Sequence, residues 1–179
     1  MSQLILRQTS GETGFGVGVV TDLAGQPVFH IAGDFGRIGD KLILTDQSQH
    51  PLAEIEQTAI GILPKFILKA NGQEVGSFGL SLQFREILYI SHTNWLVFGN
   101  TFSHNYNIAR MSGILAQARA GEANRIKIEI SAEEHTTALV LIVAFLERWQ
   151  ATHAMFGAQF RKITASDDQV LALPTSMHN

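Results

Sequence analysis

One uninterrupted apolar stretch, Thr137–Phe145, limits the folds open to this chain more than any other feature of its sequence. It is apolar around the whole circumference of a helix, which is typical of a helix buried in a core or of a membrane span. A span needs about 20 apolar residues, and this stretch has roughly half of that. Charged residues bound it, Glu133 and Glu134 before it and Glu147 and Arg148 after it. We therefore expect a helix buried inside the protein.

Short runs of β-favouring residues precede the apolar stretch, with turn signals about every 8–12 residues, a spacing typical of a β-sandwich or β-barrel. They predict roughly twelve strands. The runs are Gln3–Gln8, Phe15–Thr21, Pro27–Ala32, Lys41–Thr45, Leu52–Gln57, Lys65–Lys69, Glu74–Leu80, Glu86–Ser91, Trp95–Gly99, His104–Arg110, Gly113–Arg119 and Arg125–Ser131. In the last run isoleucines alternate with charged residues, which indicates one buried and one solvated face, as antiparallel sheets allow.

The connections between these runs alternate in character. Asn71-Gly72 predicts a two-residue hairpin turn, because both residues tolerate positive φ. Four of the alternate connections are longer and richer in glycine: Thr9–Gly14, Gly33–Asp40, Thr58–Pro64 and Ala120–Asn124. In an up-and-down meander, alternate connections lie at opposite ends. We therefore expect one end with tight turns and one wider, looser end.

The predicted helix follows the last strand and covers about residues 132–151. Ser131 and Glu134 have the spacing of a capping box, in which the serine caps a free backbone N–H and the glutamate reaches back. We expect residues 1–151 to form one domain. Residues 152–179 are expected to be a tail that packs on the outside of this domain, with Ser166–Asn179 loosely ordered.

Composition excludes several classes of function. The net charge of −3 lacks the basic excess that binds nucleic acid by displacing counterions, and argues less strongly against a polybasic membrane anchor. The absence of cysteine excludes disulfides, zinc fingers and thiol catalysis. The first residues lack the basic and apolar regions of a signal peptide, so we expect a cytoplasmic protein without a transmembrane segment.

Several segments, taken in order, resemble the LURP-one-related family, which shares the Tubby-like C-terminal fold. They are Gly33–Leu42, Leu44–Asp46, Pro51–Ile55 and Ile62–Lys65, and the resemblance covers most of 27–150. It implies a closed, twelve-stranded antiparallel barrel threaded by an apolar helix, a mainly β (α+β) fold that agrees with the predicted strands and helix. Related barrels include the Tubby proteins, which bind phosphoinositides, and the phospholipid scramblases. No Tubby lipid-binding residue has a matching position here, and this chain is slightly acidic.

Motifs that suggest chemistry each have a simpler explanation. Gly14–Gly18 is similar to a dinucleotide-binding loop, but a strand rather than a helix follows it. Gly33–Lys41 is similar to a phosphate loop, but Asp40 interrupts it and would repel phosphate. His92 and His104 end neighbouring predicted strands, yet no third metal ligand is evident from the spacing. We therefore expect neither a metal nor a cofactor.

Basic residues gather at the predicted wide end, where a ring of them would suit an anionic headgroup. The candidate binding residues are Arg37, Lys41, Lys65 and Arg85, with Arg119 and Arg125 nearby. Two observations oppose the idea. Asp34, Asp40, Glu86 and Glu122 fall at the same end, and the helix C-terminus there carries partial negative charge. A mixed, solvated rim is the alternative.

These observations favour a non-catalytic binding or scaffold module of the LURP-one-related type, acting on a lipid headgroup or a protein partner. The helix that fills the barrel leaves little room for a substrate cavity. Three alternatives stay open: a hydrolytic enzyme whose site is assembled from loops, a structural or oligomeric role, and lipid handling of the scramblase kind. The last would require the apolar helix to leave the barrel.

Overall fold

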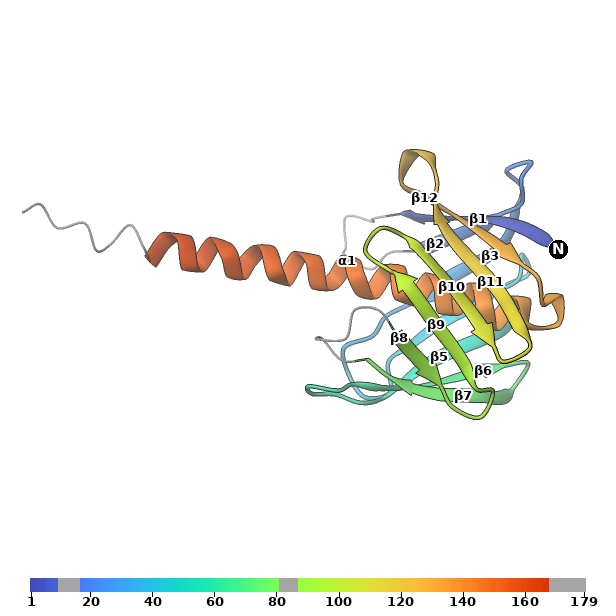
Figure 1. The fold of residues 1–179 in the computed structure, drawn as a ribbon, viewed down its shortest axis with the longest axis horizontal. Helices are drawn as coiled ribbons and strands as arrows, with labels where there is room; N and C mark the ends of the chain where they lie inside the picture. The colour runs from blue at the N-terminus through green and yellow to red at the C-terminus, as the bar shows by residue number, and fades with distance from the viewer. Residues whose placement is uncertain (10–16, 81–86, 168–179) are drawn as a thin grey trace, which may run out of the picture. The chain divides into compact units, whose positions relative to one another are not determined.

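The computed structural model describes residues 1–9, 17–80 and 87–167 (Figure 1). The chain divides into two compact units, Met1–Glu147 and Arg148–Asn179. The first unit contains the strands and the first turns of the long helix α1 (Thr136–Asp167). Its fold therefore positions the side chains of any site on the strands.

Twelve strands lie in the described part of the first unit, and each falls on a run that the sequence predicts. They are β1 (Ser2–Thr9), β2 (Val17–Thr21), β3 (Pro27–Gly33), β4 (Lys41–Thr45), β5 (Pro51–Ala59), β6 (Lys65–Ala70), β7 (Gln73–Gly79), β8 (Ile87–Ile90), β9 (Trp95–Asn100), β10 (Asn105–Arg110), β11 (Gly113–Ala120) and β12 (Arg125–Ile130). The predicted beginnings at Phe15 and Glu86 lie outside the described residues.

The strands form one antiparallel meander in the order β7-β6-β5-β4-β3-β2-β1-β12-β11-β10-β9-β8. The first strand pairs with the last, with Ser2 opposite Ile130. This pairing curls the sheet into a nearly closed barrel, as predicted. The remaining gap lies between β7 and β8, the two edge strands of the sheet.

Hydrogen bonds between two serines join these two edge strands, and a glycine permits their close approach. Ser91 donates its backbone N–H to the carbonyl of Ser77 at 2.9 Å, and the two hydroxyl oxygens lie 2.9 Å apart. A β-carbon on Gly76 would collide with the carbonyl oxygen of Ser91, so the approach needs glycine. Beside it, His92 Nδ1 lies 3.1 Å from Glu74 Oε1. We call this contact region the β7–β8 seam.

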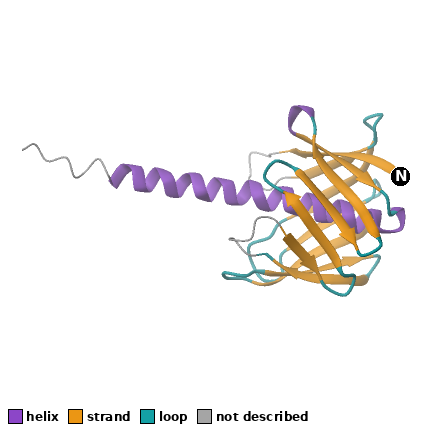
Figure 2. Cartoon of the chain, in the orientation of Figure 1, coloured by secondary structure: helices purple, strands orange, loops and turns teal. Residues whose placement is uncertain are grey.

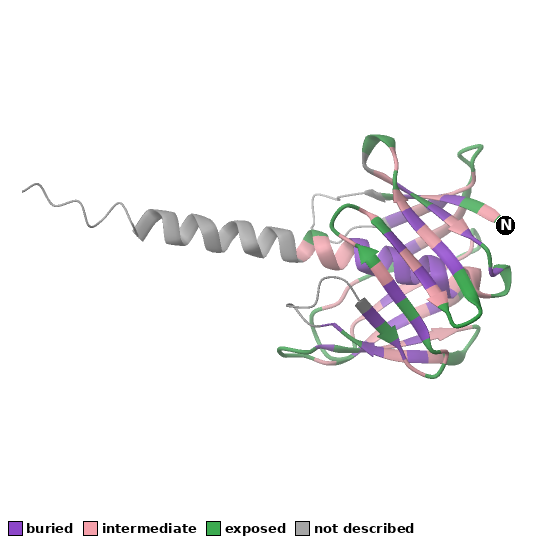
Figure 3. Cartoon of the chain, viewed as in Figure 1, coloured by how far each residue is buried: buried purple, intermediate pink, exposed green. Residues whose placement is uncertain are grey.

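Side chains alternate between the barrel interior and its outer wall, which follows from the two-residue period of a strand. In β12, Ile126, Ile128 and Ile130 are buried, while Lys127 points outward and is exposed. Figure 3 shows the same alternation of buried and exposed residues along the other strands. The predicted alternation is confirmed.

Helix α1 supplies the centre of the core. Residues 138–147 are buried, and Leu139–Val143 are wholly inaccessible to solvent. Figure 2 shows this part of the helix between walls of strands. The predicted buried helix is confirmed, but the helix continues to Asp167 rather than ending near residue 151. Residues 152–167 contain no proline and many good helix formers, so nothing local stops the helix. That residues 152–179 pack on the barrel stays a prediction.

The predicted capping box is wrong. Ser131 is exposed, and its backbone N–H donates to the carbonyl of Leu115 at 2.8 Å. A short 3-10 turn, η2 (Glu133–His135), precedes α1 without a side-chain cap. The carboxylate of Glu133 instead accepts a hydrogen bond at 2.8 Å from the N-terminal ammonium of Met1. The start of the helix is thus held by contacts with distant parts of the chain.

Successive connections lie at opposite ends of the barrel, as the meander requires. The tight end comprises loops 22–26, 46–50, 71–72, 91–94 and 111–112, and the wide end comprises loops 34–40, 60–64, 101–104 and 121–124, the last holding η1 (Glu122–Asn124). Asn71 and Gly72 have φ of 51° and 75°, which confirms the predicted hairpin turn. The helix segment 136–147 enters at the tight end and reaches the wide end at Glu147, because it follows β12 directly.

Candidate functional site

The loop 34–40 of the wide end is bound closely to the neighbouring strand β5. Gly33 has a φ of 107°, and any β-carbon there would collide with the carbonyl of Lys41. The side-chain oxygen of the buried Gln57 accepts a hydrogen bond from the N–H of Gly36 at 2.7 Å. The backbone carbonyl of Gln57 accepts a second one from the N–H of Gly39 at 2.8 Å. Gly33 thus permits a close approach of two backbone segments, and the N–H groups of Gly36 and Gly39 are bound by Gln57.

This loop places Phe35 in an aromatic cluster at the wide end. The ring centroids of Phe35 and Phe145 are 5.2 Å apart, and those of Phe66 and Phe145 are 4.7 Å apart. Phe78 stacks on Phe66 at 5.4 Å. Such edge and offset contacts are favourable ring geometries. The cluster joins the helix to β6, β7 and the loop.

A buried carboxylate lies at the end of the helix segment inside the barrel. Glu147 is only 5% exposed, and its Oε1 accepts a hydrogen bond from the hydroxyl of Tyr106 at 2.9 Å. Its Oε2 lies 2.5 Å from Nδ1 of His104, which is partly open to solvent. His104 follows loop residues 101–103 and has a φ of 53°, an uncommon backbone conformation outside glycine. We call these three residues the Glu147 cluster.

The surroundings shift the acidity of this cluster. Burial raises the pKa of Glu147, and the nearby His104 and the hydrogen bond from Tyr106 only partly oppose it. Burial also raises the pKa of Tyr106 well above its ordinary value, and the Glu147 carboxylate adds to that effect. The cluster pairs a carboxylate with an imidazole, the pairing that orients a general base in many hydrolases.

The two histidines that the sequence places at neighbouring strand ends are far apart along the barrel. His92 belongs to the tight end and contacts Glu74, whereas His104 belongs to the wide end and contacts Glu147, with the strand β9 between them. In the described part of the chain, no three His, Cys, Asp or Glu side chains are placed to hold a metal ion.

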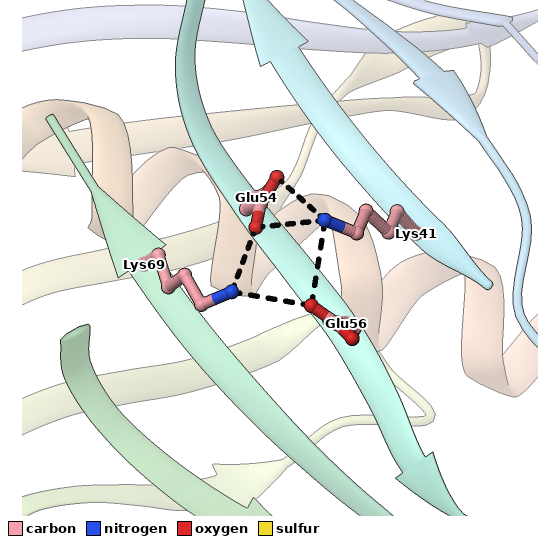
Figure 4. A network of polar contacts seen from close by, with 4 residues as sticks. All are labelled: Lys41, Glu54, Glu56 and Lys69. Atoms are coloured by element: carbon pink, nitrogen blue, oxygen red, sulfur yellow. Dashed lines mark hydrogen bonds and ion pairs between the residues drawn. The ribbon is translucent and has the colours of Figure 1, made fainter. Parts of the chain in front are cut away.

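A four-residue ion-pair network covers part of the outer wall on β4, β5 and β6 (Figure 4). Lys41 Nζ lies 3.1 Å from Glu54 Oε1 and 3.4 Å from Glu56 Oε2, and Lys69 Nζ lies 3.1 and 3.2 Å from the same atoms. The hydrogen bonds to Glu54 raise the pKa of both lysines. Burial alone would raise the pKa of Glu54, but the hydrogen bonds and charges of the two lysines outweigh it and lower this pKa.

The basic residues that the sequence predicts at the wide end differ from one another in their contacts. Lys41 faces the outer wall and is committed to this network. Arg37 and Lys65 are exposed at the wide end, and among the described residues neither has an ion-pair partner. Arg85 lies outside the described residues. Arg119 is held by the carbonyls of Tyr106 and Ala118 and by two side-chain oxygens, which use most of its donors.

Four aliphatic side chains are exposed on two adjacent loops of the wide end, and sequence reasoning missed them. Ile38 is 66% exposed, and Ile60, Ile62 and Leu63 are 58%, 86% and 51% exposed. We call these four residues the apolar tip. In Figures 1 and 3 the β5–β6 connection is an exposed, projecting loop. The signal was available: aliphatic residues in a predicted connection have no core to face.

These features define a class of protein: an antiparallel β-barrel threaded by its own apolar helix. A model of the LURP-one-related family matches residues 3–147. The chain belongs to this family, and the resemblance described from its motifs is confirmed. The segment Gly33–Leu42 that carried the resemblance is the loop bound to β5 by Gln57.

Two relatives are informative. The chain is 29% identical over 84 residues to the uncharacterized protein YxjI of Bacillus subtilis (strain 168), a match covering 46% of this chain and 52% of YxjI. The chain thus spans about half the length of the curated relative it matches. The X-ray structure of a protein from Arabidopsis thaliana is similar with a TM-score of 0.53 at 15% identity, over 81% of this chain and 91% of that one. This likeness supports the fold alone.

Within the described residues, no helix combines the length and the apolar character needed to cross a membrane. The most apolar part of α1 is the segment buried among the strands.

Proposed function

We propose that this chain is a non-catalytic binding module with a Tubby-like fold, which engages a lipid headgroup or a protein partner through the outside of its wide end. The observation that carries the proposal is the filled interior, where α1 residues 138–147 are buried against the strands. A partner then has to be met on the surface rather than in a cavity.

The wide end supplies the features that such a partner would contact. Its loops present the apolar tip, and Arg37 and Lys65 are exposed beside it. We also propose that Lys41 and Arg85 contribute, to a smaller extent. Lys41 would first have to break its ion pairs with Glu54 and Glu56 to bind an anion. The net charge of −3 argues against nucleic acid as the partner, and we place the module in the cytoplasm.

Site-specific photocrosslinking in the cells that express the full chain tests this proposal. A photoreactive phenylalanine analogue at position 62, in the apolar tip, should give discrete lipid or protein adducts. The matched control is the same analogue at position 111, since Met111 is fully exposed but belongs to the tight end. Equal adduct patterns at positions 62 and 111, or none at either, would contradict the proposal.

A second candidate function rests on the Glu147 cluster. The carboxylate–imidazole pair is the base half of a hydrolytic site, and the raised pKa of Glu147 marks a group held in an unusual environment. A hydrolytic site would also need a nucleophile within hydrogen-bond distance of His104. Ser103 precedes His104, but its hydroxyl donates to the carbonyl of Asn100 at 3.4 Å. Ester hydrolysis by the wild type that is lost in His104→Ala would support this candidate, and equal rates in both proteins would rule it out.

A further inference from the structure

We propose that the apolar tip is a membrane-docking element that inserts its aliphatic side chains into the interface of an anionic lipid bilayer. This inference rests on the proposed binding function and names its partner. The tip consists of Ile38 on loop 34–40 and Ile60, Ile62 and Leu63 on loop 60–64.

The tip is supported by ordered structure. The backbone N–H of Gln57 donates to Asp40 O at 2.9 Å, and the Gln57 amide donates to Ala59 O at 3.1 Å, so one residue ties both loops. At the far side of loop 60–64, Pro64 O accepts the N–H of Leu80 at 3.1 Å. The aliphatic groups are therefore held outward at small ordering cost, which is a requirement for shallow insertion.

The shape and chemistry of the tip favour a bilayer over a protein partner. Protein interfaces usually need about 800 Å² on each side and centre on Trp, Tyr or Arg anchors. The tip is a small projection with four aliphatic side chains and no aromatic one. A bilayer accepts such a projection without a complementary pocket, because its interface is fluid and apolar below the headgroups.

Charge around the tip suits an anionic surface. Arg37 directly precedes Ile38, and Lys65 follows Leu63 by two residues; both are exposed, without an ion-pair partner among the described residues. The carboxylates of Asp34 and Asp40, the acidic groups of loop 34–40, accept backbone N–H groups of Phe35 and Arg37 at 2.8 and 2.9 Å. They still oppose binding electrostatically, so the aliphatic groups supply most of the affinity and the two cations add a lipid-charge preference.

Vesicle flotation of the full chain tests the inference, with phosphatidylcholine vesicles that either contain or lack phosphatidylserine. The wild type should float with the anionic vesicles and less with the neutral ones. The double variant Ile60→Ser/Ile62→Ser should lower the partition coefficient about 100-fold, since each lost side chain is worth roughly tenfold. Arg37→Ala/Lys65→Ala should remove the preference for phosphatidylserine while keeping the weaker neutral binding.

The matched control is Leu23→Ser/Met111→Ser, which removes two exposed apolar side chains from the tight end and should float like the wild type. Failure of the wild type to float with either vesicle, or equal loss in the tip and control variants, overturns the inference. If flotation fails while position 62 still crosslinks to a protein, the lipid partner is wrong and the binding module stands. If both fail, both proposals are wrong.

Discussion

At the scale of single residues, Glu147 has the environment least like water among the described carboxylates of the barrel. It is buried, it is held by Tyr106 and His104, and burial raises its pKa. A buried charge is tolerated only when it is hydrogen-bonded. Its two partners therefore decide what this position contributes to stability.

Tyr106→Phe should destabilise the protein by about 1–3 kcal/mol, because it removes a buried donor to a carboxylate while keeping the ring. Urea unfolding at neutral pH measures the change in free energy. The control is Tyr89→Phe, whose hydroxyl donates to Asn94 at an exposed site and should matter little. Equal effects at both positions would show that Glu147 does not depend on the hydroxyl.

The raised pKa of Glu147 predicts how its contribution to stability varies with pH. The native state holds this proton more tightly than the unfolded state, whose carboxyl has an ordinary pKa near 4.5. The contribution is therefore fully present below about 4.5 and is lost as the pH rises through the raised native pKa. The Glu147→Gln variant has no carboxyl group at this position to titrate. The difference in melting temperature, variant minus wild type, should therefore increase as the pH rises.

Thermal melts of both proteins across this pH range measure the difference. The loss of a hydrogen bond in Glu147→Gln adds an offset that does not change with pH. Repeating the pair of melts in a His104→Ala background removes the imidazole that faces Glu147. A difference that stays constant with pH in that background would contradict the raised pKa.

At the scale of elements, the β7–β8 seam is the least regular junction of the barrel. The other neighbouring strands pair along antiparallel registers, some of them with one register shift, whereas the described parts of β7 and β8 meet around Ser77 and Ser91. Gly76 permits that approach. The integrity of the barrel therefore depends strongly on one glycine.

Gly76→Ala should destabilise the protein by about 1–3 kcal/mol, because its methyl group would force β7 away from the carbonyl of Ser91. Hydrogen exchange at the Ser91 amide should accelerate along with the loss of stability seen in urea. Gly79→Ala on the same strand is the control, since its methyl would meet only the flexible side chain of Leu63 and the carbonyl of Pro64 at ordinary distances. Equal losses would mean that the seam is not closely packed at Gly76.

At the scale of the whole molecule, the helix segment inside the barrel acts as the core on which the curved sheet closes. Leu141 is fully buried at its centre, and Phe145 joins it to the aromatic cluster. Inward residues of strands far apart in the sequence pack on this one segment. Folding of the barrel and insertion of the helix should therefore be a single cooperative event.

Leu141→Asp should abolish cooperative folding, because an unpaired charge in this core costs at least about 4 kcal/mol of a total that is typically 5–15. Near-ultraviolet circular dichroism and thermal melting measure the loss. Met111→Asp, at a fully exposed position of the tight end, is the control and should melt like the wild type. A normally folded Leu141→Asp protein would also reopen the hypothesis that the helix leaves the barrel to handle lipid.

Local pattern in the sequence by itself determined the strands, the Asn71-Gly72 turn and the burial of the helix. The reason is that strand alternation, turn conformation and helix length are encoded within a few neighbouring residues. The segment Gly33–Leu42 likewise carries the family resemblance in its local sequence, and the family match over residues 3–147 confirms it.

Only the tertiary structure decided the contacts between residues distant in sequence. Glu147 contacts His104 and Tyr106 because of the orientation of the helix about its own axis inside the barrel. Lys41 pairs with Glu54 because of the register between neighbouring strands. No local period specifies either quantity. For the same reason Ser131 could be read as a helix cap, although its N–H is taken by Leu115 from another strand. The aliphatic residues of the apolar tip stand in predicted connections, which indicates exposure, but only the structure brings the two loops that carry them together at one end of the barrel.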